Sequence, residues 1–262
     1  MSRKTILAPV ALLLTAASLV LLWFVILSGV TRTSPLRQTY FLRADTSGYE
    51  GARAISQWTY FHVCGNDNTD CGPARPALPL GDAWASNARN VPAELVGNHG
   101  NDTTGTYYWY MWRFGWVFFL IALVFEVVAF FSGFLALCSR LGSAFTGLLS
   151  MVALFFLTIA VSLMTVTFVK VRNVMIADGR DATLGRYGFG FSWGAWFALF
   201  IATILFCAGR HKRRDPVAPT GTAAAATTTT PAAGRSRRTW PWTRRSASRR
   251  GYDGRRVKEE YA

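Results

Sequence analysis

The sequence predicts an all-α integral membrane protein built as a four-helix transmembrane bundle. Hydrophobic residues make up 51% of the 262-residue chain, and they gather in four long runs instead of recurring at short regular intervals. Between the first two runs lies a polar segment that is rich in Gly, Pro, Asn and Asp and holds two closely spaced cysteines. After the last run the chain becomes basic and low in complexity. We therefore expect a bundle, a disulfide-containing extracytoplasmic loop with room for short strands, and a disordered C-terminal tail.

The four apolar runs are long enough to serve as membrane spans. A hydrocarbon core about 30 Å thick needs about 20 predominantly apolar residues in a helix. We expect spans at residues 6–30, 115–138, 145–169 and 191–208. Arg3 and Lys4 before the first run also fit a cleaved signal peptide, but this run continues unbroken through Leu27 and is longer than a signal sequence requires. We interpret it as a retained anchor.

Basic residues near the span ends predict the orientation, because they prefer the cytosolic side. Basic residues flank the first span, lie in the short 139–144 turn and follow the fourth span, and all three places fall on the same side of the membrane. These residues are Arg3, Lys4, Arg140, Arg210, Lys212, Arg213 and Arg214. Residues 1–5 and 209–262, and so both termini, are expected in the cytosol, with loops 31–114 and 170–190 outside. Four basic residues of the second outer loop oppose this rule, and they are Lys170, Arg172, Arg180 and Arg186. Two aspartates beside them offset their charge only in part.

The long outer loop carries two marks of an oxidising compartment. Cys64 and Cys71 flank a segment rich in Asn and Asp, and a disulfide between them would pin a short bend and hold Trp58 against the base of the loop. Asn101 begins an Asn-Asp-Thr glycosylation acceptor. The alternative is a pair of free thiols in a cytosolic loop. The charge asymmetry favours the disulfide and an extracytoplasmic loop.

The remainder of this loop predicts little regular structure. Residues 55–64 are aromatic and β-branched and predict a strand, whereas residues 65–105 predict turns and irregular coil. We expect no hydrophobic core large enough for a separate domain. The aromatic run 107–112 is typical of a membrane–water interface, and a cage for a cationic ligand is the alternative.

One acidic residue stands out inside the spans. Glu126 lies near the centre of the second span, where a charge costs about 2.5 kcal/mol or more, so it must face the bundle. We expect it to be protonated, or hydrogen-bonded to a third-span hydroxyl such as that of Thr158, Ser162 or Thr165. A structural role in helix packing is favoured over transport chemistry, because no second intramembrane charge accompanies it.

Small residues recur at every fourth position of the last span, at Gly190, Gly194, Ala198 and Ala202. They lie on one stripe and predict close approach of another helix, either within the bundle or from a neighbouring copy. Cys138 and Cys207 lie at the cytosolic ends of their spans, where they are candidates for palmitoylation or for simple packing.

The C-terminal tail predicts a lipid-binding segment. Residues 209–262 carry 14 Lys and Arg against four Asp and Glu. The cations and tryptophans expected to bind lipid are Arg237, Arg238, Trp240, Trp242, Arg244 and Arg245. Near an anionic inner leaflet each cation contributes about 1 kcal/mol, so the expected partners are anionic membrane lipids. Nucleic acid is not an expected partner, because the tail is tethered to a membrane.

The sequence carries no motif of a known catalytic centre. It contains no P-loop, dinucleotide-binding fingerprint, metal-spaced His/Cys cluster or Ser/His/Asp set near a membrane face. Its three histidines are scattered. We therefore expect neither an enzyme nor a cofactor or metal site.

Two segments of the sequence resemble the fungal Sur-seven/PalI family. They are the loop motif from Trp58 through Tyr60 and Cys64 to Cys71, which is also similar to the claudin signature, and the entry to the last span at 184–193, LGRYGFGFSW. The resemblance covers about residues 5–209 and gives Trp58, Cys64 and Cys71 a role in folding the loop.

The resemblance implies a plasma-membrane protein of eisosome-type lateral domains, with roles in membrane organisation, endocytosis or cell-wall integrity. Expected partners are further copies of the chain or other eisosome-type membrane proteins. The alternative is a PalI-type component of ambient-pH or cell-wall signalling. A small channel or transporter is a third hypothesis that depends on Glu126 alone.

Overall fold

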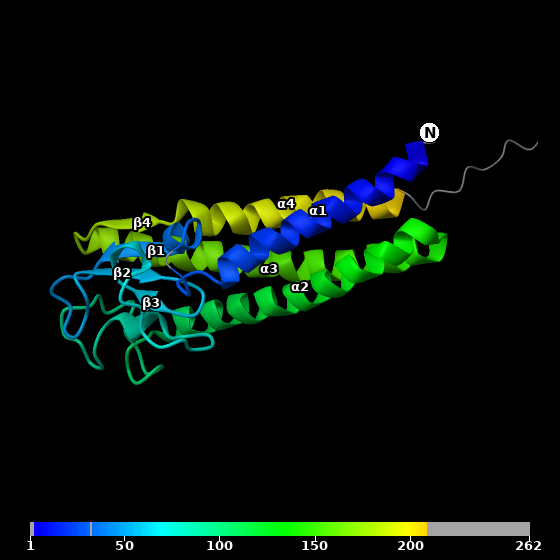
Figure 1. The fold of residues 1–262 in the computed structure, drawn as a ribbon. Helices are drawn as coiled ribbons and strands as arrows, with labels where there is room; N and C mark the ends of the chain where they lie inside the picture. The colour runs from blue at the N-terminus through cyan, green and yellow to red at the C-terminus, as the bar shows by residue number, and fades with distance from the viewer. Residues whose placement is uncertain (1–2, 32, 209–262) are drawn as a thin grey trace, which may run out of the picture. The chain divides into compact units, whose positions relative to one another are not determined.

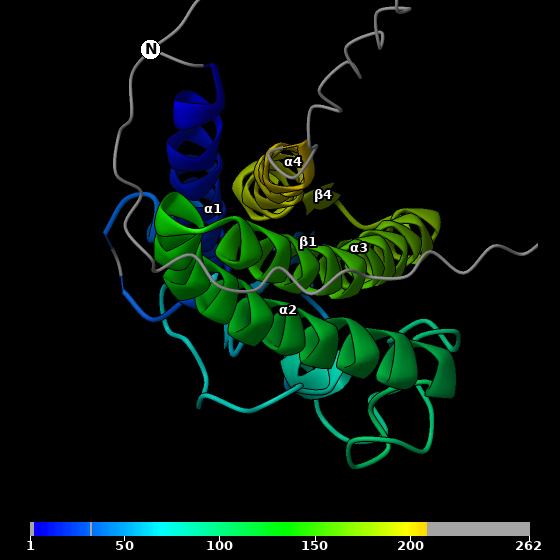
Figure 2. The same ribbon diagram turned by 90° about the vertical axis from the view of Figure 1, so that its right-hand side faces the viewer.

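The computed structural model describes residues 3–31 and 33–208, and it shows four long helices with a small β-sheet at one end of them (Figure 1). The helices are α1 (Arg3–Ile26), α2 (Thr106–Cys138), α3 (Arg140–Ala177) and α4 (Arg186–Ala208). All four are long and apolar enough to cross a membrane. Seen along the bundle, α4 lies between α1 and α3, and α2 lies against α3 (Figure 2). The predicted fold class is confirmed.

Two of the helices extend well beyond the apolar runs that predict them. Helix α2 begins at Thr106 instead of residue 115, and α3 continues to Ala177 instead of ending at residue 169. With 38 residues, α3 is about 57 Å long at 1.5 Å per residue, which exceeds the hydrocarbon core. At this end of the bundle α3 contacts β1 and β4, and α2 contacts the loop segment Leu80–Ala83. The residues of the extra turns are therefore mixed in polarity, and a hydropathy pattern does not mark them as helix.

The connection between α2 and α3 is shorter than expected. Helix α3 already begins at Arg140, so most of the predicted 139–144 turn is helical. Ser139 alone separates the two helices, and its hydroxyl caps α3 by accepting a hydrogen bond from the backbone N–H of Gly142 at 2.9 Å.

The two loops at the sheet end of the bundle join in one antiparallel sheet. Its strands are β1 (Leu42–Asp45), β2 (Ile55–Trp58), β3 (Val63–Cys64) and β4 (Ala182–Leu184), in the order β3-β2-β1-β4. The single strand predicted over 55–64 is wrong, because a tight turn closed by the Thr59 N–H to His62 carbonyl bond divides it into β2 and β3. Strand β4 comes from the connection between α3 and α4, and its long-range pairing with β1 has no local sequence signal.

The sheet has one face toward the helices and one away from them. Leu42 of β1 stands opposite Trp58 of β2 and Leu184 of β4, and the first two are fully buried. Paired residues in an antiparallel sheet share a face, and the next residue along each strand lies on the other. Arg43, Gln57 and Thr183 therefore form a polar row across the outer face.

The long loop has no separate core, as expected, but its buried residues join the hydrophobic core of the bundle. Leu78, Leu80, Trp84 and Leu95 are buried in the same cluster as residues of α2 and α3. The segment 65–105 does consist of turns, including the short 3-10 helices Asn66–Asn68 and Leu80–Ala83. Six Asn and Asp residues adopt positive φ, a conformation that these side chains tolerate better than most: Asp67, Asn68, Asp70, Asn87, Asn101 and Asp102.

Candidate functional site: the disulfide-bonded head

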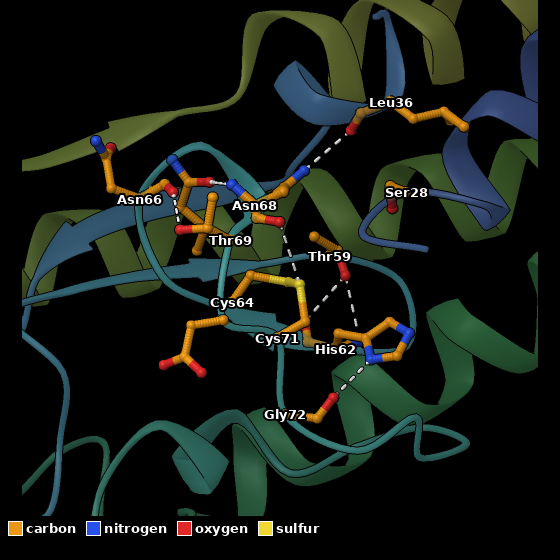
Figure 3. The surroundings of a disulfide bond; sticks show 12 residues. Ser28, Leu36, Thr59, His62, Cys64, Asn66, Asn68, Thr69, Cys71 and Gly72 are labelled. Atoms are coloured by element: carbon orange, nitrogen blue, oxygen red, sulfur yellow. Dashed lines mark hydrogen bonds between the residues drawn. A yellow bond between two sulfur atoms is a disulfide. The ribbon is translucent and has the colours of Figure 1, made fainter. Parts of the chain in front are cut away.

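The head, which we define as residues 33–105 and 178–185, contains the predicted disulfide. Cys64 and Cys71 are bonded, with their Cα atoms 3.9 Å apart (Figure 3). The loop that they close is fixed by Asn68, whose side-chain amide donates to the carbonyls of Leu36 at 3.0 Å and Thr39 at 2.9 Å. The disulfide loop is thereby tied to the segment that leads into β1.

Trp58 lies on the opposite face of the sheet from the disulfide. Cys64 stands opposite Gln57, so the bridge falls on the outer face and does not hold Trp58 directly. The indole ring is fully buried, and its N–H donates to the carbonyl of Leu80 at 2.9 Å. Its neighbour Trp84 meets it edge-on, with ring centroids 6.4 Å apart. Trp58 therefore anchors the irregular segment after the disulfide to the sheet.

Tyr60 joins the head to two helices. Its hydroxyl donates to the carbonyl of Trp116 on α2 at 2.7 Å, and the Trp116 indole donates back to the Tyr60 carbonyl at 3.2 Å. The two rings stack at 5.5 Å. The Tyr60 N–H also donates to the hydroxyl of Ser28, just beyond α1. Burial raises the pKa of Tyr60 well above its ordinary value, so the phenol remains a neutral donor.

Beneath the sheet, Phe41 connects the head to the other two helices. Its ring stacks on Phe168 of α3 at 5.2 Å and meets Phe189 of α4 at 5.6 Å. Close approach of β1 to α4 depends on two glycines of the LGRYGFGFSW segment. A Cβ atom at Gly185 or Gly188 would overlap the carbonyl group of Tyr40. The need for glycine at these two positions comes from a contact between distant segments, which has no local signal in the sequence.

A polar clamp holds the connection between α3 and α4 against the long loop. The hydroxyl of Tyr49 donates to Asp178 at 3.0 Å, and the guanidinium of Arg180 lies 4.8 Å from the centre of the Tyr49 ring. Arg180 also donates to the carbonyl of Ser47. Burial, followed by the bond to Asp178, raises the pKa of Tyr49 to about 12. Arg180, which opposes the predicted orientation, thus has a structural role in the head.

The aromatic run at the start of α2 has two different surroundings. Tyr107 and Tyr110 are exposed, as an interfacial belt requires, whereas Tyr108 and Trp112 are buried against the head and α3. The chain's own cations occupy two of the ring faces. Lys170 lies 4.0 Å from the centre of the Tyr107 ring, and the neighbouring Arg113 lies 3.6 Å from that of Trp109. These pairs disfavour the cage for an external cation.

Glu126 is fully buried, as its place in the span predicts, but the expected hydrogen bond to α3 is absent. Neither carboxyl oxygen has a hydrogen-bond partner among the residues that the structure describes. Thr158 and Thr165 bond instead to carbonyls of their own helix and to the indoles of two α4 tryptophans. The hydroxyl of Ser18 on α1 does not donate to Glu126 either, because it donates to the carbonyl of Ala195 on α4.

The small-residue stripe of α4 does not face a single neighbour. A Cβ atom at Gly194 would lie 3.3 Å from the side chain of Leu21 on α1, and Ala202 is fully buried. No atom of the described chain would lie within 4 Å of a Cβ atom at Gly190. Ala198 is half-buried. Gly194 and Ala202 therefore pack within the bundle, while Gly190 lies on its outer surface.

The remaining predicted sites have less structural context. Cys207 is half-buried, and its sulfur would lie 3.6 Å from a Cβ atom at Gly147 on α3, which agrees with a packing role. The side chain of Cys138 and the lipid-binding tail residues lie outside the described part. Asn101 lies on an exposed turn, and its glycosylation stays a prediction.

The geometry of the head is suited to rigid presentation of a surface. In the ranges 3–31 and 33–208, no group of three or more His, Cys, Asp or Glu residues could hold a metal ion. The buried side chains of Trp58, Tyr60 and Trp84 donate to backbone carbonyls and brace one segment against another. These features define a class of protein: a four-helix membrane protein whose two connections at one end fold into a single disulfide-bonded head.

Comparison with known proteins identifies the family. The SUR7/PalI family profile matches residues 7–205, so the chain belongs to this family, as the loop motif and the entry to the last span predict. The chain is 37% identical over 198 residues to Protein SUR7 of Candida albicans, which covers 74% of this chain and 70% of that protein.

Two relatives from Saccharomyces cerevisiae match similar regions. SUR7 family protein FMP45 is 35% identical over 191 residues, covering 70% of this chain but only 60% of that protein. An uncharacterized plasma membrane protein is 28% identical over 225 residues, covering 82% of this chain and 72% of the relative.

Proposed function

We propose that this protein is a non-enzymatic organiser of lateral domains in the plasma membrane. The observation that supports this most directly is the apolar outer surface of the bundle. Large hydrophobic side chains are at least half exposed on every helix, including Leu13, Val124, Phe131, Leu141, Phe155 and Phe197. In a bilayer, only lipid chains or other membrane proteins can cover such a surface.

One face of α4 has the shape expected for contact with a neighbouring copy. Tyr187, Trp193 and Phe197 are exposed on the same side of the helix as Gly190. The glycine leaves a notch among these large side chains, and small residues at such positions allow helix backbones to approach closely. Self-association through this face is therefore part of the proposal.

We also propose that the head lies outside the cell and both termini in the cytosol. The Cys64–Cys71 disulfide supports this orientation, because structural disulfides persist in oxidising compartments. The first residues of α1 and the last of α4 lie at the end of the bundle away from the sheet (Figure 1). A protease-cleavable tag after Ala262 should resist protease in intact cells, and its cleavage there would contradict the orientation.

The tail is proposed to bind anionic lipid of the inner leaflet through its arginines, with Trp240 and Trp242 inserting at the interface. A peptide of residues 235–256 should bind phosphatidylserine vesicles and be released by salt, since surface attraction decays within about 10 Å at 0.1 M salt. The matched control is the same peptide with Gln at every arginine. Equal binding of the two peptides to phosphatidylserine vesicles would contradict an electrostatic mechanism. Equal binding of the unmodified peptide to neutral and anionic vesicles would contradict it as well.

The organiser hypothesis is tested by imaging a fluorescent fusion in living cells. The unmodified protein should form patches that do not recover within minutes after photobleaching. Gly190→Leu should disperse these patches, because it fills the outward notch without touching another part of the described chain. Val124→Leu is the matched control, since it enlarges an exposed side chain on α2.

Each alternative function has its own signature in the same cells or in vesicles. A uniform, mobile rim signal for the unmodified protein would contradict the organiser hypothesis. Loss of pH-dependent signalling in the deletion strain would then favour the PalI-type alternative. Ion or solute flux across proteoliposomes that is abolished by Glu126→Gln would establish the channel or transporter.

A further inference from the structure

The outer face of the sheet opens into a polar cavity beside the start of α4. The cavity measures about 560 Å³, within the range of roughly 300–1,000 Å³ that is usual for small-ligand sites. Its lining comes from both loops of the head and from the first residues of α4: Gln38, Tyr40, Arg43, Gln57, Asn66, Asp67, Thr183, Leu184, Arg186 and Tyr187. Apart from Tyr187, which also borders the proposed self-association face of α4, none of these groups takes part in the function proposed above.

Two guanidinium groups line this cavity without a counter-charge of their own. Within residues 33–208, neither Arg43 nor Arg186 forms an ion pair or a side-chain hydrogen bond. The Nε atom of Arg43 is buried and unpartnered, which is a costly state for a charged group. Arginine remains protonated at any physiological pH, so both positive charges are permanent.

The acidic groups nearby do not neutralise this pair. Asp67 lines the same cavity, but it is bonded to Arg37 at 2.9 Å. Asp45 and Asp181 line a second cavity that shares Arg43 and Thr183 with the first, and within residues 33–208 neither is within ion-pair distance of Arg43. The cavity is therefore left with an excess of positive charge and with amide and hydroxyl groups that can donate hydrogen bonds.

The position of the cavity limits what can reach it. Arg186 is the first residue of the helix that would enter the membrane, and Tyr187 beside it is exposed and packs on Phe191, one turn further in. A molecule whose acyl chains lie along α4 would have its headgroup at this level. Planar guanidinium groups bind the phosphate of such a headgroup through paired charge-assisted hydrogen bonds.

We propose that this cavity binds an anionic phosphate group, with Arg43 and Arg186 as its ligands. The occupant is a phospholipid headgroup or a free phosphate, because the two share this chemistry. The site accounts for the unpaired cation of Arg186 at the start of α4, where the orientation rule disfavours positive charge. It does not depend on the organiser hypothesis and holds for either orientation of the bundle.

The test uses the full-length protein purified in a neutral detergent. Three probes are titrated: dioctanoyl phosphatidic acid, dioctanoylglycerol with the same chains but no phosphate, and inorganic phosphate. The readout is the midpoint of thermal unfolding as a function of probe concentration, which gives the half-saturating concentration. The variants are Arg43→Gln and Arg186→Gln, with Arg89→Gln as the matched control, because Arg89 is exposed in the head and does not line the cavity.

Phosphatidic acid should raise the unfolding midpoint, and dioctanoylglycerol should not. Arg43→Gln and Arg186→Gln should each raise the half-saturating concentration about tenfold or more, because each removes charge-assisted hydrogen bonds. Arg89→Gln should leave it unchanged. The basic tail is present in every variant, so its own binding of anionic lipid cancels in the comparison.

The other outcomes distinguish the occupant or overturn the proposal. Saturation by inorganic phosphate at an equal or lower concentration, with the same dependence on both arginines, would identify free phosphate as the occupant. Equal effects of phosphatidic acid and dioctanoylglycerol would exclude phosphate recognition. An unchanged half-saturating concentration in Arg186→Gln, whose side chain is exposed, would refute the site, as would an equal loss in Arg89→Gln.

Discussion

Replacing Gly188 by alanine should destabilise the junction between the head and α4. A Cβ atom at this position would overlap the carbonyl oxygen of Tyr40, lie 2.9 Å from its carbonyl carbon and lie 3.5 Å from the nitrogen of Phe41. These are main-chain atoms of the segment that enters β1, so no side-chain rotation can relieve the overlap. Either α4 or the edge of the sheet has to move.

The expected magnitude follows from comparison with Gly190→Ala two residues along the same helix. Both changes bring a similar gain in helix propensity, about 1 kcal/mol at most. At Gly190 the added methyl group would meet no atom within 4 Å, so that gain is unopposed. At Gly188 it is opposed by overpacking, which costs about 2–3 kcal/mol for an overlap with main chain. The unfolding midpoints of the two variants should therefore differ by roughly 5–10 °C.

The measurement is the fraction of full-length protein that remains monodisperse after heating in detergent, followed by tryptophan fluorescence on size-exclusion chromatography. Gly188→Ala should lose this fraction at the lower temperature, and Gly190→Ala should match or exceed the unmodified protein. Equal midpoints would refute the close approach of β1 and α4. A loss confined to Gly190→Ala would show that this face is already packed in the isolated protein.

Three further predictions concern the bonds that brace the head. Tyr60→Phe should lower the free energy of unfolding by about 1 kcal/mol, because the buried hydrogen bond to the Trp116 carbonyl is lost, while that carbonyl keeps its donor within α2. The exposed control Tyr110→Phe should change the free energy little in the same heating assay. Tyr49→Phe should reduce the loss of stability at alkaline pH. The pKa of Tyr49 is about 12 in the folded state and 10 ordinarily, so its contribution to stability is complete below pH 10 and is lost between pH 10 and 12. Identical profiles of unfolding midpoint against pH for the variant and the unmodified protein would contradict this. Cys71→Ser should leave Cys64 open to alkylation after denaturation and reduce surface delivery, and alkylation of both cysteines in the unmodified protein under non-reducing conditions would show that the bridge is not formed in cells.

The sequence alone was sufficient for features that depend on local composition. Four apolar runs predict four membrane-spanning helices, because hydrocarbon requires long stretches of apolar helix. The cysteine pair at 64 and 71 predicts a disulfide because the two residues are close along the chain. Aspartates and asparagines in segment 65–105 predict turns, since their side chains tolerate the positive φ found there.

The pairing of strands that are distant in sequence could not be predicted from the sequence, and this pairing forms the head and its cavity. Nothing local indicates that β4, from the connection between α3 and α4, pairs with β1 more than a hundred residues earlier. That pairing places Arg43 and Arg186 in the lining of one cavity, and it requires the glycines that face Tyr40. Lys170 and Arg180 oppose the orientation rule, and their structural roles follow only from their neighbours in space.

The sequence by itself determined the class of this protein: a four-span membrane protein of the SUR7/PalI family with a short disulfide loop and a basic tail. The tertiary structure decided that the two loops form one head, which residues brace it, and which small residue of α4 stays open. The physical reason is that hydropathy and turn preference act over a few residues, whereas burial, close backbone approach and the pairing of charges depend on atoms brought together from distant parts of the chain.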